Sequence, residues 1–175
     1  MIMPSRKKLI VVAVILASSL VAASLAMMYR GETLSAPQMI TACGPRISIV
    51  EGEEAVEEIN KLHWSGDVGV TNAIISKYAC GVRLWVSVSK EDAKKLVDMM
   101  ANTIMIHSSR GVLPLEFLGQ RVVGKCIVYL VADANGQIHA FWGKDHIEIW
   151  VETATSDLDR ALDIVGEIAQ YYGCT

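Results

Sequence analysis

The sequence predicts an α+β fold, a two-layer sandwich of a mostly antiparallel sheet with three amphipathic helices on one face, behind one N-terminal transmembrane or signal-anchor helix. Three observations support this prediction. A long apolar run without a charge lies near the N-terminus. Six later segments have the residue pattern of strands, and three others repeat apolar residues with the period of a helix. Their order, β-α-β-β-α-β-β-β-α, is typical of helices packed on an antiparallel sheet.

The apolar run Leu9–Met28 follows three cations at residues 6–8. As a helix it spans roughly 30 Å, the thickness of a bilayer's hydrocarbon core. The preceding cations predict that residues 1–8 are cytoplasmic and that everything beyond about residue 30 lies outside. Segment 9–29 is therefore a retained transmembrane helix or, because small residues accumulate in its second half, a cleaved signal peptide. In either case the protein is expected at the plasma membrane or secreted.

The part beyond the apolar run is acidic. The first 30 residues hold four of the 16 Lys and Arg and none of the 19 Asp and Glu, so residues 31–175 carry 12 cations and 19 acids, a net charge of −7. Such a surface offers no phosphate-binding stripe. We therefore expect no nucleic acid among the partners.

The first half of the exported part begins with a predicted tether at residues 30–45, which are rich in Gly, Ser and Pro and show little periodicity. One domain, residues 46–175, follows. The predicted elements in this half are a strand at 46–50, a helix at 53–62, strands at 72–78 and 82–88, and a helix from the cap-like Ser89–Asp92 to about His107.

The second half of the domain starts with a predicted short turn of helix at 115–119. Residues 121–132 then predict a single strand, placed centrally because residues 126–131 are apolar on both faces. Asp133–Gly136 is a strong turn signal. The remaining predicted elements are strands at 137–142 and 146–152 and a helix at 156–172.

Two parts of this map resemble each other. Trp85 and Trp150 each lie in a strand with the pattern apolar, charged, apolar, Trp, Val, polar, and each strand leads into an amphipathic helix. Another strand precedes each copy, so the chain contains β-β-α twice. This indicates an internal duplication, or coincidence, because any strand followed by a helix alternates in a similar way.

The four cysteines, Cys43, Cys80, Cys126 and Cys174, are too widely spaced for a zinc ribbon. In an oxidising exterior an even number favours disulfides. We predict Cys43–Cys174, which would tie the entry of the domain to its end, and Cys80–Cys126, which would join two strands. Four reduced or partly buried thiols are the alternative.

The side chains most suited to binding are Trp85 and Trp150. Strand alternation places both on the face opposite Leu84 and Ile149, which we expect to be the face without helices. There they could bind a ligand or partner, with Trp142 and Phe141 extending the patch. Alternatively, each indole only covers its neighbours on a half-exposed sheet.

Evidence for catalysis is weak. His63, Asp67, His139 and His146 could line a pocket, but the histidine spacing matches no metal site, and we predict neither a metal nor a cofactor. No nucleophile, phosphate-binding or dinucleotide motif occurs. The sequence therefore favours a membrane-tethered extracytoplasmic domain that binds a protein partner or a small ligand. The alternatives are an extracytoplasmic hydrolase and a self-associating subunit of the cell envelope.

Overall fold

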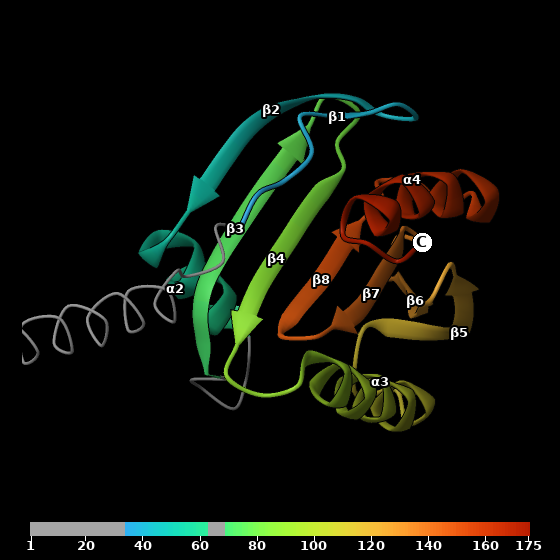
Figure 1. Cartoon of the computed structure of the whole chain (residues 1–175). Coiled ribbons are helices and arrows are strands. Elements are labelled where there is room, and N and C mark those ends of the chain that lie inside the picture. The colour runs from blue at the N-terminus through green and yellow to red at the C-terminus, as the bar shows by residue number, and fades with distance from the viewer. Residues whose placement is uncertain (1–33, 63–68) are drawn as a thin grey trace, which may run out of the picture. The chain divides into compact units, whose positions relative to one another are not determined.

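The computed structural model describes residues 34–62 and 69–175. These residues form one eight-stranded antiparallel sheet and three helices, which confirms the α+β class (Figure 1). The strands are β1 (Met39–Ile40), β2 (Gly44–Glu51), β3 (Val70–Tyr78), β4 (Arg83–Ser89), β5 (Leu115–Val123), β6 (Cys126–Asp133), β7 (Ile138–Lys144) and β8 (Ile147–Glu152). The helices are α2 (Glu53–Leu62), α3 (Ala93–Ser109) and α4 (Leu158–Tyr171).

The strands of the sheet follow the order β1-β2-β3-β4-β8-β7-β6-β5. Its two halves, β1–β4 and β5–β8, therefore meet at the antiparallel pair of β4 and β8. Trp85 lies directly opposite Trp150 in that pair. The register thus brings the two similar sequence segments together at the centre of the sheet.

Helices cover both faces of the sheet, so the prediction of three helices on one face is wrong. α4 packs against a core that includes Leu84, Leu130 and Val151, whereas α2 and α3 pack against residues of the opposite parity, such as Ile75 and Phe141. Figure 1 shows α4 and α3 on opposite sides of β7 and β8. The physical reason is that the inner strands are apolar on both faces and need cover on both.

The placement of the helices also limits the predicted duplication. In an exact repeat, α3 and α4 would both cover the face of the sheet that bears the tryptophans, or both cover the opposite face. The structure instead places α3 on the face that bears Trp85 and Trp150, and α4 on the other face. The likeness therefore holds for the strands and fails for the helices.

Residues 115–133 form a hairpin of β5 and β6. The predicted turn of helix at 115–119 and the predicted single strand at 121–132 are therefore wrong. The chain reverses at Gly124, which has a φ of 58°. A side chain there would collide with the carbonyl oxygen of Cys174, so this turn requires glycine.

All four cysteines form disulfides, but the pairs differ from the predicted ones. Cys43 bonds to Cys80, with 5.1 Å between the Cα atoms, and Cys126 bonds to Cys174, with 5.3 Å. Strand pairing explains the first bond, because β2 lies beside β3 and the amide of Ala79 donates to the carbonyl of Pro45. Both bonds join segments that the sheet and α4 already hold together.

Residues 34–42 cross the face of the sheet that α4 covers, although the sequence assigns them to the tether. Ala36 and Ile40 are 4% and 1% exposed, and the hydroxyl of Tyr78 donates to the carbonyl of Pro37. The domain therefore begins to pack at residue 34.

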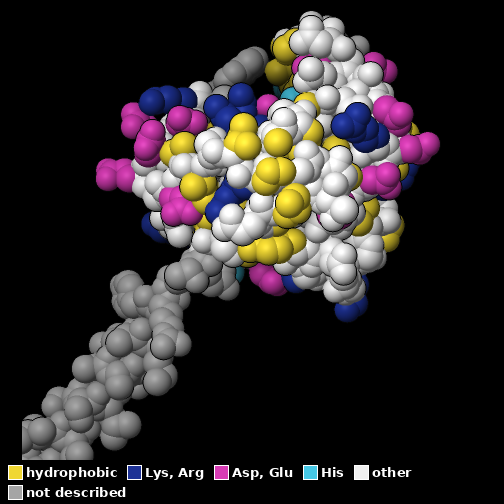
Figure 2. All heavy atoms as spheres, turned by 90° about the horizontal axis from the view of Figure 1, so that it is seen from above, with side chains coloured by type: hydrophobic (Ala, Val, Ile, Leu, Met, Phe, Trp, Pro, Cys, Tyr) yellow, Lys and Arg dark blue, Asp and Glu magenta, His cyan; other side chains and the backbone are white. Residues whose placement is uncertain are grey.

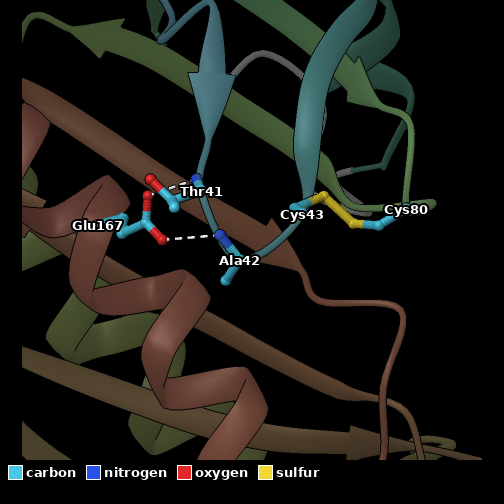
Figure 3. The surroundings of a disulfide bond; sticks show 5 residues. All are labelled: Thr41, Ala42, Cys43, Cys80 and Glu167. Carbon is cyan, nitrogen blue, oxygen red and sulfur yellow. Dashed lines mark hydrogen bonds between the residues drawn. A yellow bond between two sulfur atoms is a disulfide. The ribbon is translucent and has the colours of Figure 1, made fainter.

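Glu167 of α4 fixes the end of this segment. Its carboxylate accepts hydrogen bonds from the backbone amides of Thr41 (2.6 Å) and Ala42 (2.9 Å), next to the Cys43–Cys80 bond (Figure 3). Burial tends to raise the pKa of Glu167, but the two amide donors outweigh it and hold the pKa below its usual value.

Replacing Gly143 with Ala should destabilise the domain by about 3 kcal/mol. A methyl group at this position of β7 would collide with the backbone of Ala93, where α3 begins. The matched control is Gly166→Ala, because Gly166 lies within α4 and has open space around it. This control should gain roughly 0.5–1 kcal/mol in helix propensity. Urea denaturation measures both, and equal stability of the two variants would contradict the close approach of α3 to β7.

Glu167→Gln should cost about 1–3 kcal/mol at neutral pH, because one of the two amides loses its acceptor and the other loses a charged one. Since the pKa of Glu167 is lower in the folded state, its contribution is complete above the ordinary glutamate pKa of about 4.3 and is lost as the pH falls through the lowered value. The difference in unfolding free energy between wild type and variant should therefore shrink below about pH 4. A difference that is constant from pH 7 to pH 3 would show that the charge of Glu167 has no part in docking residues 41 and 42.

Candidate functional site

A row of aromatic side chains crosses the face of the sheet that carries α2 and α3. Each residue of the row lies directly opposite the next one on the neighbouring strand. The row consists of Tyr129 on β6, Phe141 on β7, Trp150 on β8 and Trp85 on β4. The rings of Phe141 and Trp150 stack at 4.8 Å with 10° between their planes, and those of Tyr129 and Phe141 stack at 5.5 Å. Such cross-strand aromatic pairs stabilise the sheet beyond their burial.

Helices cover the two ends of this row and leave its centre less protected. Phe141 is buried in the cluster under α3, and Ile75, which follows Trp85 in the row, is buried in the cluster under α2. Trp85 and Trp150 lie between these clusters, and each is only partly buried. Strand alternation thus correctly places them opposite Leu84 and Ile149, but two helices share their face.

Charged and polar residues flank the two indoles. The next row on the same face, two residues along each strand, holds Arg83 on β4, Glu152 on β8 and His139 on β7. Glu152 lies directly opposite both of the others. Together with Trp85 and Trp150 they form what we term the tryptophan strip.

The indole N–H groups of the strip already have acceptors. Trp85 donates to Glu152 over 2.9 Å, and Trp150 donates to Nδ1 of His139 over 3.2 Å. The guanidinium of Arg83 lies 3.5 Å from the second oxygen of Glu152 and 5.7 Å from the centre of the Trp85 ring. The tryptophans therefore offer a partner apolar ring surface, and charged groups of both signs surround them.

His139 connects the strip to the turn after β6. Because its Nδ1 accepts from Trp150, its Nε2 carries the proton of the neutral ring, 3.8 Å from Oδ2 of Asp133. Burial tends to raise the pKa of Asp133, but hydrogen bonds from the amides of Gln137 and Asn135 and the nearby His139 hold it below its usual value. Asp133 is thus a carboxylate, and one of its oxygens accepts the two amide hydrogen bonds that close the turn.

A third carboxyl group, that of Glu148, lies on the other side of the tryptophans. Glu148 is opposite Ser87 in the pair of β4 and β8, on the same face as Trp150. Burial raises the pKa of Glu148, and a hydrogen bond with Ser89 opposes this only in part.

The other sequence-predicted site residues lie elsewhere. Phe141 and Trp142 are both 0% exposed and point to opposite faces of β7, so neither extends an exposed patch. His146 is exposed, with Nδ1 3.0 Å from the carbonyl of Glu91. His63 and Asp67 lie outside the described residues. Within residues 34–62 and 69–175, no group of three or more His, Cys, Asp and Glu could hold a metal ion.

Sequence reasoning missed a hollow of about 590 Å³ at the edge of the sheet, which we term the edge hollow. It lies where the end of α3, the following loop and β5 meet the turn after β6. No local pattern in residues 115–119, for which the sequence predicts a turn of helix, points to it. Its lining comprises Met105, Ser108, Ser109, Leu113, Pro114, Leu115, Glu116, Phe117, Asp133 and Ala134.

Further apolar side chains are exposed at the end of the molecule where β1 turns into β2. Met39 and Ile47 are 57% and 67% exposed. Figure 2, which views the molecule from the side that is uppermost in Figure 1, shows hydrophobic side chains gathered near the middle of this surface.

Comparison of the chain with protein-family models, with curated proteins and with solved structures finds no match. In the part of the chain that the structure describes, no helix is long and apolar enough to cross a membrane. The predicted membrane segment, residues 9–29, lies outside that part.

The neutral ring of His139 should be the tautomer with its proton on Nε2, because Nδ1 accepts the indole N–H of Trp150. ¹⁵N NMR of the histidine rings above pH 8 measures this directly. In Trp150→Phe the donor is lost while a ring still faces Phe141, so the Nδ1-protonated form of His139 should rise. A dominant Nδ1–H form in the wild type would contradict the hydrogen bond.

Proposed function

We propose that the protein is a membrane-tethered extracytoplasmic domain that binds a protein partner through the tryptophan strip. The observation that carries this proposal is the pair of partly exposed indoles whose N–H groups are already bonded and whose border is charged. Aromatic ring surface inside a rim of charge is typical of the centre of a protein–protein interface. A small ligand, which the sequence also allows, would find ring surface but no free indole donor here.

Two features support the location. Two disulfides are typical of proteins that fold in an oxidising environment. The apolar run with its preceding cations is the pattern of a signal anchor that leaves the rest of the chain outside.

The hydrolase and the self-associating envelope subunit stay predictions of the sequence. Neither is favoured by a particular contact of the described residues. The strip holds its histidine in a hydrogen bond to an indole rather than beside a hydroxyl or thiol nucleophile.

The double variant Trp85→Phe with Trp150→Phe tests the strip. Phenylalanine retains an aromatic ring at each position but removes the indole surface, so recovery of the partner after cross-linking in living cells should fall at least tenfold. The matched control is Trp142→Phe, the same change at an indole that is 0% exposed on the opposite face, and it should leave recovery unchanged. Thermal unfolding of each purified variant establishes that it is folded.

Arg83→Glu provides a second variant that leaves both indoles in place, since the side chain of Arg83 is 39% exposed. It should also reduce recovery, because it places a carboxylate beside Glu152. Undiminished recovery with the folded double variant and with Arg83→Glu would overturn the proposal, as would an equal loss with Trp142→Phe.

A further inference from the structure

The edge hollow combines an apolar wall with carboxylates. Leu113, Leu115 and Phe117 supply apolar surface, as does Met105, which is 45% exposed. Glu116 and Asp133 supply the only charges among the ten lining residues, and no Lys or Arg is present. The volume of about 590 Å³ is far larger than one methylene chain needs, so a long side chain and part of its backbone would fit.

Asp133 has one oxygen that the fold does not use fully. Oδ1 accepts both amide donors of the turn, from Asn135 and Gln137. Oδ2 lies 3.8 Å from Nε2 of His139, which is too long for a hydrogen bond, and the side chain of Asn135 is also close to the carboxylate. An added donor could therefore bind Oδ2 without opening the turn.

Ser108 adds an independent sign of a missing contact. Its hydroxyl oxygen is buried and has no hydrogen-bond partner among the described residues, and Ser108 lines the hollow. Buried hydroxyl groups without a partner are costly, and each calls for an explanation. Because this oxygen has almost no accessible surface, a donor in the hollow would reach it only after the Ser108 side chain turned.

We propose that the edge hollow binds a lysine or arginine side chain from an extended, basic segment of a partner protein. The aliphatic stem of such a side chain would cover Phe117 and Leu115, and its cation would bind Asp133. The net charge of −7 on residues 31–175 favours the approach of a basic segment. β5 is the last strand of the sheet, so an extended backbone can lie along it. This surface is separate from the tryptophan strip and does not require that the strip bind anything.

The probe is the peptide acetyl-Val-Lys-Val-Lys-Val-amide, with acetyl-Val-Glu-Val-Glu-Val-amide as its control. The readout is NMR of the ¹³C-labelled methionine methyl groups of the full chain in detergent. Met105 lines the hollow, whereas Met99, which is 59% exposed on the same helix, does not. The lysine peptide should shift the Met105 signal saturably at millimolar concentration or below, with the Met99 signal unchanged. The glutamate peptide should shift neither.

Asp133→Asn should weaken binding of the lysine peptide at least fivefold. Asparagine keeps the oxygen that accepts the turn amides and removes only the charge. Glu116→Gln is the second variant, and Asp163→Asn, an exposed acid on α4, is the control that should bind as the wild type does. The Trp85→Phe, Trp150→Phe protein should still bind the lysine peptide, which separates this proposal from the proposed function.

Three results would overturn the proposal. One is an equal response to both peptides, and another is unchanged affinity in both Asp133→Asn and Glu116→Gln. The third is a Met105 shift that appears on raising the protein concentration without peptide, because it would assign the hollow to a second copy of this chain.

Discussion

β4 and β8 join the two halves of the sheet through six paired positions, from Arg83 opposite Glu152 to Val88 opposite Ile147. Every other strand contact lies within one half, either β1–β4 or β5–β8. The single ladder therefore fixes which residues of the first half share a face with which residues of the second. A slip of one residue would exchange Leu84 for Trp85 in the core under α4, and neither face would then match its helices.

This register explains how the core and the tryptophan strip arise together. With Trp85 opposite Trp150, the residues on either side of each tryptophan pair as Leu84 with Val151 and Val86 with Ile149, and all four are buried. The same alignment sets Arg83 beside Glu152, within reach of the Trp85 ring. The apolar face requires the alignment, and the polar arrangement on the opposite face follows from it.

Much of the fold could be predicted from the sequence, because residue periodicity reports local structure. The helices at 53–62 and 158–171 and the hairpin of β7 and β8 match their predicted positions closely. Periodicity shows which side of a helix is apolar, but not which face of the sheet it meets, and the prediction failed at that step for α2 and α3. The hairpin of β5 and β6 was missed because its two-residue turn, Gly124–Lys125, lacks the Asn-Gly or Asp-Gly signal that usually marks a tight hairpin. The disulfides depend on the β2–β3 pairing and on the docking of the C-terminus at Gly124, and neither is a local property.

The candidate sites, like the fold, could be predicted only in part from the sequence. Alternation gave the face of Trp85 and Trp150, but Phe141 and Trp142 are consecutive in a strand and could not both have joined them. The acceptors Glu152 and His139 and the edge hollow arise from contacts across strands, which the sequence does not record.

The bond between Cys43 and Cys80 has a mechanical consequence for a domain held at its N-terminus. Tension applied there passes along residues 34–42 to Cys43 and then crosses the sulfur atoms directly to the turn between β3 and β4. The stretch of chain enclosed by this bond, which contains β2, α2 and β3, carries none of the pull. Force applied at that end would load β1, which precedes Cys43, and would then arrive at β4, the strand that joins the two halves of the sheet, without unravelling β2, α2 and β3.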